Sequence, residues 1–543
     1  MKRKLIIILI AIFSLTACNE IFEIAPQDKI SETDVWSDAS LIQLYVNACY
    51  TNTFQQGLFR TTQIGHATDE LHSIKGSVYY KIIQQGDLTP DNLSYIHAFL
   101  NNWADAYSVI REVNIFFDKI EETSINDETK NRMMGEMTLI RAFLYSQLIW
   151  RYGGVPIIED VFELNDNYDM ERSSYDDCVS YIITEIDKAI ALLPDGKLTG
   201  SDLGKVSADV ARALKSRVLL YAASPLNNPS NDQTKWQKAA DAAADLIGVG
   251  YSLYNDYYGL FQSDNEEIIF ARYFTQANST MFSMQVGRCG DHGWGSDSPT
   301  QNLIDDYEMA NGQLPLNEDG TVNAASGYDP ANPYLGRDPR FYASVLYDGA
   351  MWMGRETETF KGGLDSRDGP IDSWNGTMSG YYLKKFVPEN IPPVGSSELP
   401  TNPYVIFRYG EILLNYAEAE FMLGEEGTAR EYLNMVRSRP GVEMPAITAS
   451  GDDLLDAIHH ERRIELVFEG HRFFDVRRWE IADNTESKNI IGMQIIKETD
   501  GTKSYSRINL IDRKWDDKLY LLPIPRAEID RSNNSLVQNP GYN

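Results

Sequence analysis

Apolar side chains recur every three or four positions through much of the chain, which is the spacing that places them on one face of a helix. The clearest stripe begins at Met133 and ends at Leu148, just before Gly153-Gly154-Val155-Pro156, and it predicts a helix of about five turns. A second stripe begins at Val206 beside the candidate N-cap Ser207 and ends at Ser224-Pro225. Further helical patterns cover residues 93–120, 174–193, 235–248, 407–423, 427–438 and 452–468.

Short polar breaks separate several of these helical stretches, as in antiparallel helix hairpins that stack like tetratricopeptide repeats. The repeat signature is incomplete, because Trp103 and Tyr107 fit its start only loosely and no strict period of about 34 residues appears. Two β-rich runs, Glu267–Ala271 and Lys518–Leu522, predict a few short strands. We therefore predict a mostly α fold of tetratricopeptide-like helix hairpins. Long irregular loops are expected at 52–92, 250–300 and 311–404.

The N-terminus has the pattern of an export signal. A positive stretch, Lys2–Lys4, precedes the apolar run Leu5–Phe13, which is about half as long as a membrane-crossing helix. The segment ends in Leu15-Thr16-Ala17-Cys18, which resembles the lipobox of bacterial lipoprotein signal peptides. We expect residues 1–17 to be a lipoprotein signal peptide and Cys18 to carry the acyl chains that anchor the mature protein. An ordinary signal peptide with a chance cysteine is the alternative.

Length, charge and cysteine content narrow the function classes. The 543 residues include 49 basic and 79 acidic side chains, a formal charge of -30, so the average surface repels nucleic acid and anionic membranes. Three further cysteines lie far apart in the sequence and predict neither a disulfide framework nor a CxxC metal site.

We expect residues 18–225 to form an N-terminal helical part and residues 226–543 a C-terminal part with ligand loops, together one globular unit.

Several short motifs follow one another along nearly the whole mature chain. They are Arg141-Ala142-Phe143-Leu144-Tyr145 with Arg151-Tyr152-Gly153-Gly154-Val155-Pro156, Leu220-Tyr221-Ala222-Ala223-Ser224-Pro225, Pro299-Thr300-Gln301, Arg337-Asp338-Pro339-Arg340-Phe341, Asn415-Tyr416-Ala417-Glu418-Ala419, Glu461-Arg462-Arg463-Ile464-Glu465-Leu466, Phe468-Glu469-Gly470-His471-Arg472-Phe473-Phe474-Asp475, and Leu522-Pro523-Ile524-Pro525 before Gln538-Asn539-Pro540-Gly541-Tyr542. Any single motif is a weak signal. Their order and spacing together resemble the SusD/RagB family of outer-membrane nutrient-binding lipoproteins of the Bacteroidetes.

This resemblance implies a tetratricopeptide-like scaffold whose long loops build a ligand face. It also implies a surface-exposed outer-membrane lipoprotein that captures a glycan and passes it to a SusC-like TonB-dependent transporter, over which it acts as a lid. Family members bind nutrients without catalytic residues, so no enzyme activity is expected. The alternatives are a peptide-binding lipoprotein of the same import system and, from another class, a secreted glycoside hydrolase.

Tryptophan position is the most informative variable for glycan recognition, because sugar rings stack on flat apolar faces. Most tryptophans lie in or beside predicted helices and strands and are expected to be structural. Trp294, Trp352 and Trp374 instead lie in loops rich in Gly, Ser and Asp, where an exposed ring would otherwise be a liability. We predict these three as ligand contacts, with packing inside the loops as the alternative.

Polar residues near these loops form a weaker set of ligand-binding candidates. They are His72, Lys75, Tyr79 and Tyr80 in the loop 71–80, and Arg288 and Asp291, with His292, beside Trp294. The loop 71–80 combines adjacent aromatic residues with polar ends, and the corresponding loop of the family borders the ligand face. Loop packing is the alternative for each of them.

Patterns that suggest catalysis or metal binding have simpler explanations. Glu411 and Glu418 share one helical face, and a glycosidase needs two carboxylates about 5–10 Å apart, but acids on a helix face more often pair with arginines. His459-His460-Glu461 departs from H-E-x-x-H, because Ile464 occupies the position of the second histidine. No cofactor is expected. Acidic loops are able to bind Ca²⁺, but no D-x-[DN]-x-[DN]-G loop occurs, so the sequence predicts no specific Ca²⁺ site.

Overall fold

The computed structural model describes residues 35–54, 62–73, 78–96, 100–163, 166 and 169–542, so the expected signal peptide 1–17 and Cys18 lie outside the described residues. The helices are α3 Ala39–Phe54, α5 Val78–Gln84, α6 Trp103–Ile120, α7 Asp127–Tyr152, α8 Tyr175–Leu192, α9 Ala208–Ala223, α10 Gln233–Ala244, α11 Phe282–Val286, α12 Gln301–Asp306, α13 Pro339–Ser344, α14 Tyr409–Met422, α15 Glu426–Arg437, α16 Asp452–Glu465, α17 Arg472–Arg478, α18 Ala482–Thr485 and α19 Arg526–Arg531. The strands are β1 Leu71–Ser73, β2 Ile268–Arg272, β3 Asp297–Pro299, β4 Val345–Leu346, β5 Met351–Trp352, β6 Arg355–Glu356, β7 Tyr382–Leu383, β8 Tyr404–Arg408, β9 Ile490–Lys497 and β10 Lys503–Ile511.

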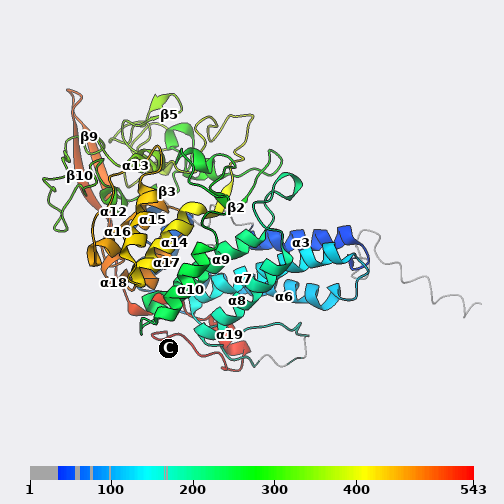
Figure 1. The fold of residues 1–543 in the computed structure, drawn as a ribbon. Helices are drawn as coiled ribbons and strands as arrows, with labels where there is room; N and C mark the ends of the chain where they lie inside the picture. The colour runs from blue at the N-terminus through cyan, green and yellow to red at the C-terminus, as the bar shows by residue number, and fades with distance from the viewer. Residues whose placement is uncertain are drawn as a thin grey trace, which may run out of the picture.

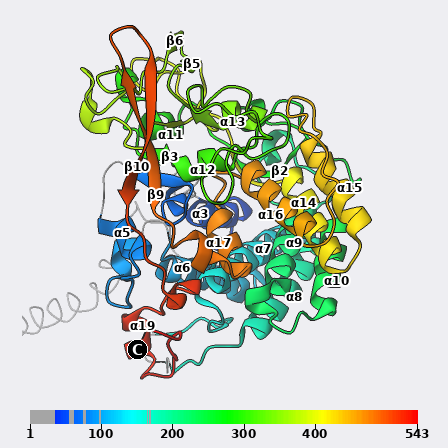
Figure 2. The same ribbon diagram turned by 90° about the vertical axis from the view of Figure 1, so that its left-hand side faces the viewer.

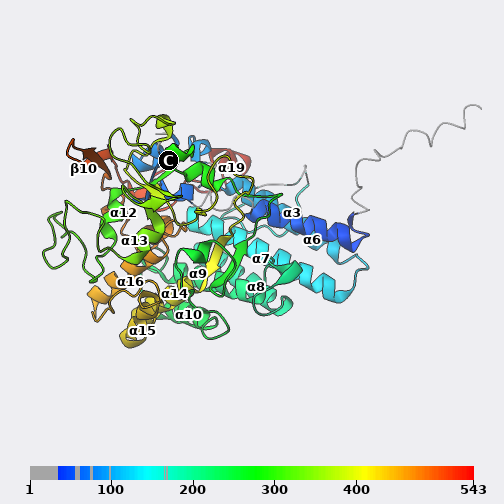
Figure 3. The ribbon, with the colours of Figure 1, turned by 90° about the horizontal axis from the view of Figure 1, so that it is seen from above.

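The longer helices form a scaffold in which each helix packs on the next in the chain. α6 packs on α7, α7 on α8, α8 on α9 and α9 on α10, and α10 then packs on α14, which follows much later in the sequence (Figures 1 and 3). The five residues of the predicted stripe are all buried in its core: Met133, Met137, Ile140, Leu144 and Leu148. We call α6–α10 together with α14–α16 the helical scaffold. No helix in the described part of the chain is both long and apolar enough to cross a membrane.

Helix α7 shows why its predicted end was correct and its predicted length was short. It has 26 residues and begins after Asn126, whose side chain accepts a hydrogen bond from the Thr129 backbone N–H at 3.0 Å. Its first turns are polar and carry no apolar stripe, so the periodicity missed them. The helix ends at Gly153, which has φ 74°, and a Cβ at the next residue, Gly154, would lie 2.1 Å from the Ser173 carbonyl oxygen.

A second layer consists of loops with short strands and has a core of its own. This loop layer comprises residues 250–404 and the hairpin 490–511, and its buried residues include Phe261, Tyr307, Phe341 and Tyr381. Each sheet is two-stranded, with pairs β1–β3, β2–β8, β4–β7, β5–β6 and β9–β10. Figure 2 shows the β9–β10 hairpin running along one side of the loop layer to the edge of the molecule.

The two predicted strands have different outcomes. The run Glu267–Ala271 corresponds to β2, which confirms a strand there. The run Lys518–Leu522 is a 3₁₀ turn over Asp517–Tyr520, so that prediction was wrong. The physical reason is local: the Asp516 side chain accepts a hydrogen bond from the Lys518 backbone N–H at 3.1 Å and caps the turn.

Buried ion pairs join the scaffold to the loop layer. Arg408 donates to Glu267 at 2.8 Å and to Glu465 at 2.7 Å, and Arg439 also donates to both glutamates. From the loop layer, Arg340 donates to Glu465 at 3.0 Å. Because a buried charge without a partner is very costly, this network fixes how the two layers meet.

Candidate functional site

The loop layer carries a large exposed aromatic side chain, Trp374. Trp374 lies in the short 3₁₀ turn Ser373–Asn375, and 70% of it is exposed to solvent. Its loop is closed at the base, where Ser366 and Thr377 form a parallel β-bridge. A large aromatic ring held outward on a closed loop presents a flat apolar face to a ligand.

The segment around Trp294 lies against this loop. His292 Nδ1 is 2.8 Å from Asp372 Oδ2, and both residues have positive φ, 64° and 40°. Trp294 is half-buried, and its backbone N–H donates to the Met284 carbonyl at 2.7 Å. The structure therefore brings the Trp294 and Trp374 segments together at one place on the loop layer.

Trp352 lies elsewhere, inside the loop layer. It belongs to β5, is only 2% exposed, and its ring meets Tyr258 edge to face at a centroid distance of 6.2 Å. The Lys384 ammonium lies 5.3 Å from the centroid of its ring. This position agrees with the packing alternative, because a ligand could stack on Trp352 only if the ring left the core.

Arg288 and Asp291 hold the loops rather than present free groups. The buried Arg288 guanidinium donates to Asp291 at 2.7 Å, to Thr357 Oγ1 at 2.9 Å and to the Trp352 carbonyl at 3.0 Å. Burial lowers the pKa of Arg288. Arg355 also donates to Asp291, at 2.8 Å, so this carboxylate is shared between two guanidinium groups.

The first residues of the predicted loop 71–80 form β1, which pairs with β3 and so lies in the same region. His72 is buried on β1, and burial, assisted by the nearby positive charges of Arg367 and Lys81, lowers its pKa to about 4, so it is neutral at neutral pH. Tyr80 packs edge to face on the His66 ring, with centroids 4.3 Å apart. Lys75 and the side chain of Tyr79 lie outside the described residues.

Two adjoining cavities lie between these segments and the β9–β10 hairpin, and they share Met378 and Leu510 in their walls. The smaller, of about 80 Å³, is lined by His72, Ser73, Tyr80, Lys81, Gln84, Met378, Leu510 and Ile511. The larger, of about 190 Å³, is lined by Thr359, Lys361, Ser366, Arg367, Asp368, Thr377, Met378, Gly380, Met493, Gln494, Ile495, Ile508 and Leu510. Arg367 and Thr377 belong to the loop that carries Trp374, so the ring and the cavities form one candidate site.

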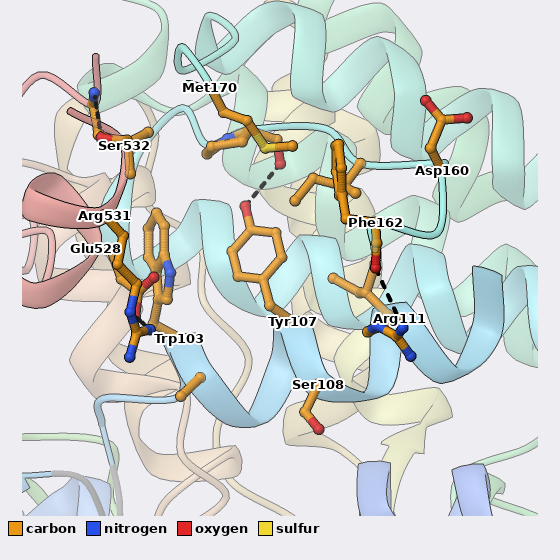
Figure 4. A pocket seen from close by; sticks show the side chains of 15 residues that line it. Trp103, Tyr107, Ser108, Arg111, Asp160, Phe162, Met170, Glu528, Arg531 and Ser532 are labelled. Carbon is orange, nitrogen blue, oxygen red and sulfur yellow. Dashed lines mark hydrogen bonds and ion pairs between the residues drawn. The ribbon is translucent and has the colours of Figure 1, made fainter. Parts of the chain in front are cut away.

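A larger hollow of about 600 Å³ lies on the helical scaffold, between α6, the segment 156–170 and α19 (Figure 4). Its aromatic walls are Trp103, Tyr107 and Phe162. The Tyr107 hydroxyl donates to the Pro156 carbonyl at 2.7 Å, and Arg111 donates to the Phe162 carbonyl at 3.3 Å, as the dashed lines of Figure 4 show. Both polar contacts tie the segment to the helix and leave the lining mainly apolar.

The two carboxylates considered for glycosidase chemistry are tied to arginines. Glu411 accepts from Arg217 at 2.6 Å, and Glu418 accepts from Arg478 at 2.7 Å and from Trp479 Nε1 at 2.8 Å. Arg478 is the main cause that lowers the pKa of Glu418 to about 2, against the effect of burial. A carboxylate held in this way is neither a proton donor nor a free nucleophile at neutral pH.

The histidine cluster is likewise built into the scaffold. The His459 ring stacks on Trp479 at a centroid distance of 3.7 Å, and Glu461 accepts from Arg437 at 2.8 Å. Within the described ranges, no group of three or more His, Cys, Asp and Glu side chains is arranged to hold a metal ion.

Sequence profiles of two families match the chain. The profile of the SusD family matches residues 265–542, about half of the chain, and a profile described as starch-binding associating with outer membrane matches residues 23–220. The chain belongs to the SusD family. Both parts of this SusD-family protein, the scaffold and the loop layer, are therefore represented in family profiles.

Solved structures and curated relatives agree with this assignment. A SusD-like protein from Bacteroides fragilis is 30% identical and superposes with a TM-score of 0.80, covering 95% of this chain and 100% of that chain. A SusD-like carbohydrate-binding protein from the same species is 24% identical, with a TM-score of 0.77 over 92% of this chain and 99% of that chain. A SusD-like protein of Bacteroides ovatus is 24% identical over 512 residues, 88% of this chain and 83% of its own length. The predicted mostly α, SusD-like fold is confirmed.

Lys81, Lys361 and Arg367 of this SusD-family protein line the cavities but were not among the residues predicted from the sequence. Arg367 could have been predicted from the sequence, because it is a basic residue in an acid-rich chain and lies on the same Gly- and Ser-rich stretch as Trp374. Lys81 and Lys361 carry no such signal, since only the fold brings α5 and the segment after β6 to the same pair of cavities.

Proposed function

We propose that this protein is a non-catalytic glycan-binding lipoprotein that captures an oligo- or polysaccharide at the face carrying Trp374. The observation that carries the proposal is the exposed Trp374 ring on a loop whose base, at Ser366 and Thr377, lines a cavity with hydroxyl, amide and charged side chains in its wall. Aromatic faces flanked by such groups suit pyranose rings, which have apolar faces and a polar rim. The carbohydrate-binding relative from Bacteroides fragilis supports the same ligand class.

We further propose that the protein works at the outer membrane with a SusC-like TonB-dependent transporter. The family profile named for association with the outer membrane supports the location, and the lipobox-like Leu15-Thr16-Ala17-Cys18 supports an acyl anchor at Cys18. As a lid over the transporter, the protein needs a ligand that binds the closed state more tightly than the open state, because equal affinity shifts nothing.

The test is calorimetry of the unlipidated mature protein against plant, host and microbial polysaccharides and against peptides, with reducing ends assayed in the same samples. We expect saturable binding of a glycan, no new reducing ends, and an affinity about threefold to tenfold weaker in Trp374→Ala, as loss of one stacking ring predicts. Tyr95→Ala is the matched control, because Tyr95 is also an exposed aromatic residue but does not line the candidate site. Binding of peptides alone would replace the proposal with its peptide-binding alternative, and turnover of a glycan would overturn the non-catalytic assignment.

A further inference from the structure

Three cations face the two adjoining cavities of the candidate site. Lys81 comes from α5, and Lys361 and Arg367 come from the segments before and within the Trp374 loop. All three are exposed, and within the described ranges none of them lies within 4.0 Å of a carboxylate. Asp368 is the one acidic residue in either cavity wall.

A cluster of three exposed basic side chains is unusual in a chain with such an excess of acidic residues. The protein has a formal charge of -30. Several other basic residues of the loop layer pair with carboxylates, while Arg337 and Lys384 donate to backbone carbonyls at 3.0 and 2.8 Å. Arg355 pairs with Asp365 at 2.7 Å, and in the hairpin Lys503 and Arg507 pair with Asp348 and Asp305. An excess of cations at one place on an acidic surface focuses a positive potential there.

The buried His72 beside these cations agrees with a positive local field. Arg367 and Lys81 are among the causes that lower its pKa, after burial and the neighbouring His66. His72 therefore stays uncharged at neutral pH, and the positive charge of the site belongs to the lysines and the arginine. Because the neutral His72 ring carries no negative charge, it does not pair with the exposed cations beside it. Those cations are therefore free to bind anionic groups of a ligand.

We infer that the glycan captured at this site is anionic and carries uronate carboxylates or sulfate esters. The inference rests on the proposed glycan-binding function and adds the substrate class. A guanidinium pairs with a carboxylate or a sulfate through two parallel hydrogen bonds, and lysine ammonium groups act as point charges for further anions. Arg367 lies on the same closed loop as Trp374, so one glycan chain can stack a ring on the indole and present an anionic substituent to the guanidinium.

The test measures binding of polygalacturonate and of carrageenan, each beside its uncharged counterpart, carboxyl-reduced polygalacturonate and desulfated carrageenan. The double variant Lys361→Gln, Arg367→Gln removes two charges with little change in size. Lys238→Gln on α10 is the control, because Lys238 is an exposed lysine remote in sequence from the site and outside its lining. Trp374→Ala separates specific binding from general attraction of polyanions.

We expect one of the two anionic polymers to bind at least tenfold more tightly than its uncharged counterpart, with an affinity that falls as salt rises. We also expect Lys361→Gln, Arg367→Gln and Trp374→Ala each to weaken it, and Lys238→Gln to leave it unchanged. The preferred polymer identifies uronate or sulfate as the anion. Equal binding of charged and uncharged polymers, or no effect of the double variant, would overturn the inference and leave glycan capture intact. Failure of every glycan to bind would overturn the proposed function itself.

Discussion

Glu70 provides a stability test that can be worked out from the structure. Its side chain is 1% exposed, one of its oxygens, Oε2, has no hydrogen-bond partner among the described residues, and its backbone carbonyl accepts from Thr300 where β1 meets β3. Burial raises the pKa of Glu70 to about 7 from an ordinary 4.5, although Arg463 acts in the opposite direction. Replacing Glu70 by Gln removes the charge while keeping the size of the side chain.

The sign follows from the direction of the shift. The folded protein holds the proton more tightly than the unfolded chain, so Glu70 costs nothing well below pH 4.5, costs progressively more between pH 4.5 and 7, and costs its full amount above pH 7. A carboxyl pKa of about 7 in place of 4.5 corresponds to about 3 kcal/mol of destabilisation once the group is ionised. We therefore expect Glu70→Gln to raise the free energy of unfolding by about 3 kcal/mol at pH 8 and by about 1 kcal/mol at pH 5.

Differential scanning calorimetry at the two pH values measures this difference. For a mature chain of this length unfolding as one unit, an entropy of about 2.1 cal/mol/K per residue converts 3 kcal/mol into about 3 °C of Tm, and 1 kcal/mol into about 1 °C. Glu122→Gln is the control, because Glu122 is exposed and outside any ion pair given by the structure. A gain in Tm that is the same at both pH values, or a loss at pH 8, would refute the assignment of an ionisable buried Glu70.

Two further predictions concern the helical scaffold and the turn that follows α7, and both are checked by the same thermal measurement. Glu418→Gln should lower stability by about 3 kcal/mol at pH 7, because it leaves the buried Arg478 without a full counter-charge. Since the Glu418 pKa is lowered to about 2, this deficit should shrink as pH falls from 4.5 toward 2, and an unchanged deficit would contradict the ion-pair explanation. Gly154→Ala should destabilise by about 1–3 kcal/mol because its Cβ would strike the Ser173 carbonyl. Gly427→Ala, in α15 with open space around it, should instead stabilise by about 0.5–1 kcal/mol, and equal effects of the two substitutions would show that the clash is absent.

Local periodicity was enough to predict the scaffold, and it failed where distant contacts decide the conformation. The stripe from Met133 to Leu148 and its stop at Gly153 depend on neighbours in sequence, so the end of α7 was predictable. Trp352 lies in a Gly-rich stretch that resembles a surface loop, yet the pairing of β5 with β6 and packing on Tyr258 bury it. Trp374 has the same sequence signature and is exposed. Composition alone cannot separate these two tryptophans, because the difference arises from what the rest of the loop layer covers.

The charges of this protein divide into two classes with separate physical roles. Buried arginines such as Arg408 and Arg340 have every charge matched by carboxylates, and removing one of them would affect folding, because the remaining partner would be buried without compensation. The cations at the candidate site are exposed and unmatched, so their removal costs little stability and changes only what the surface attracts. Because the Arg355–Asp365 ion pair and the bridge at Ser366 already fix the base of the Trp374 loop, a ligand pays little entropy to order its site. Affinity and stability should therefore respond to different substitutions, with Arg367→Gln changing the first and Glu418→Gln the second.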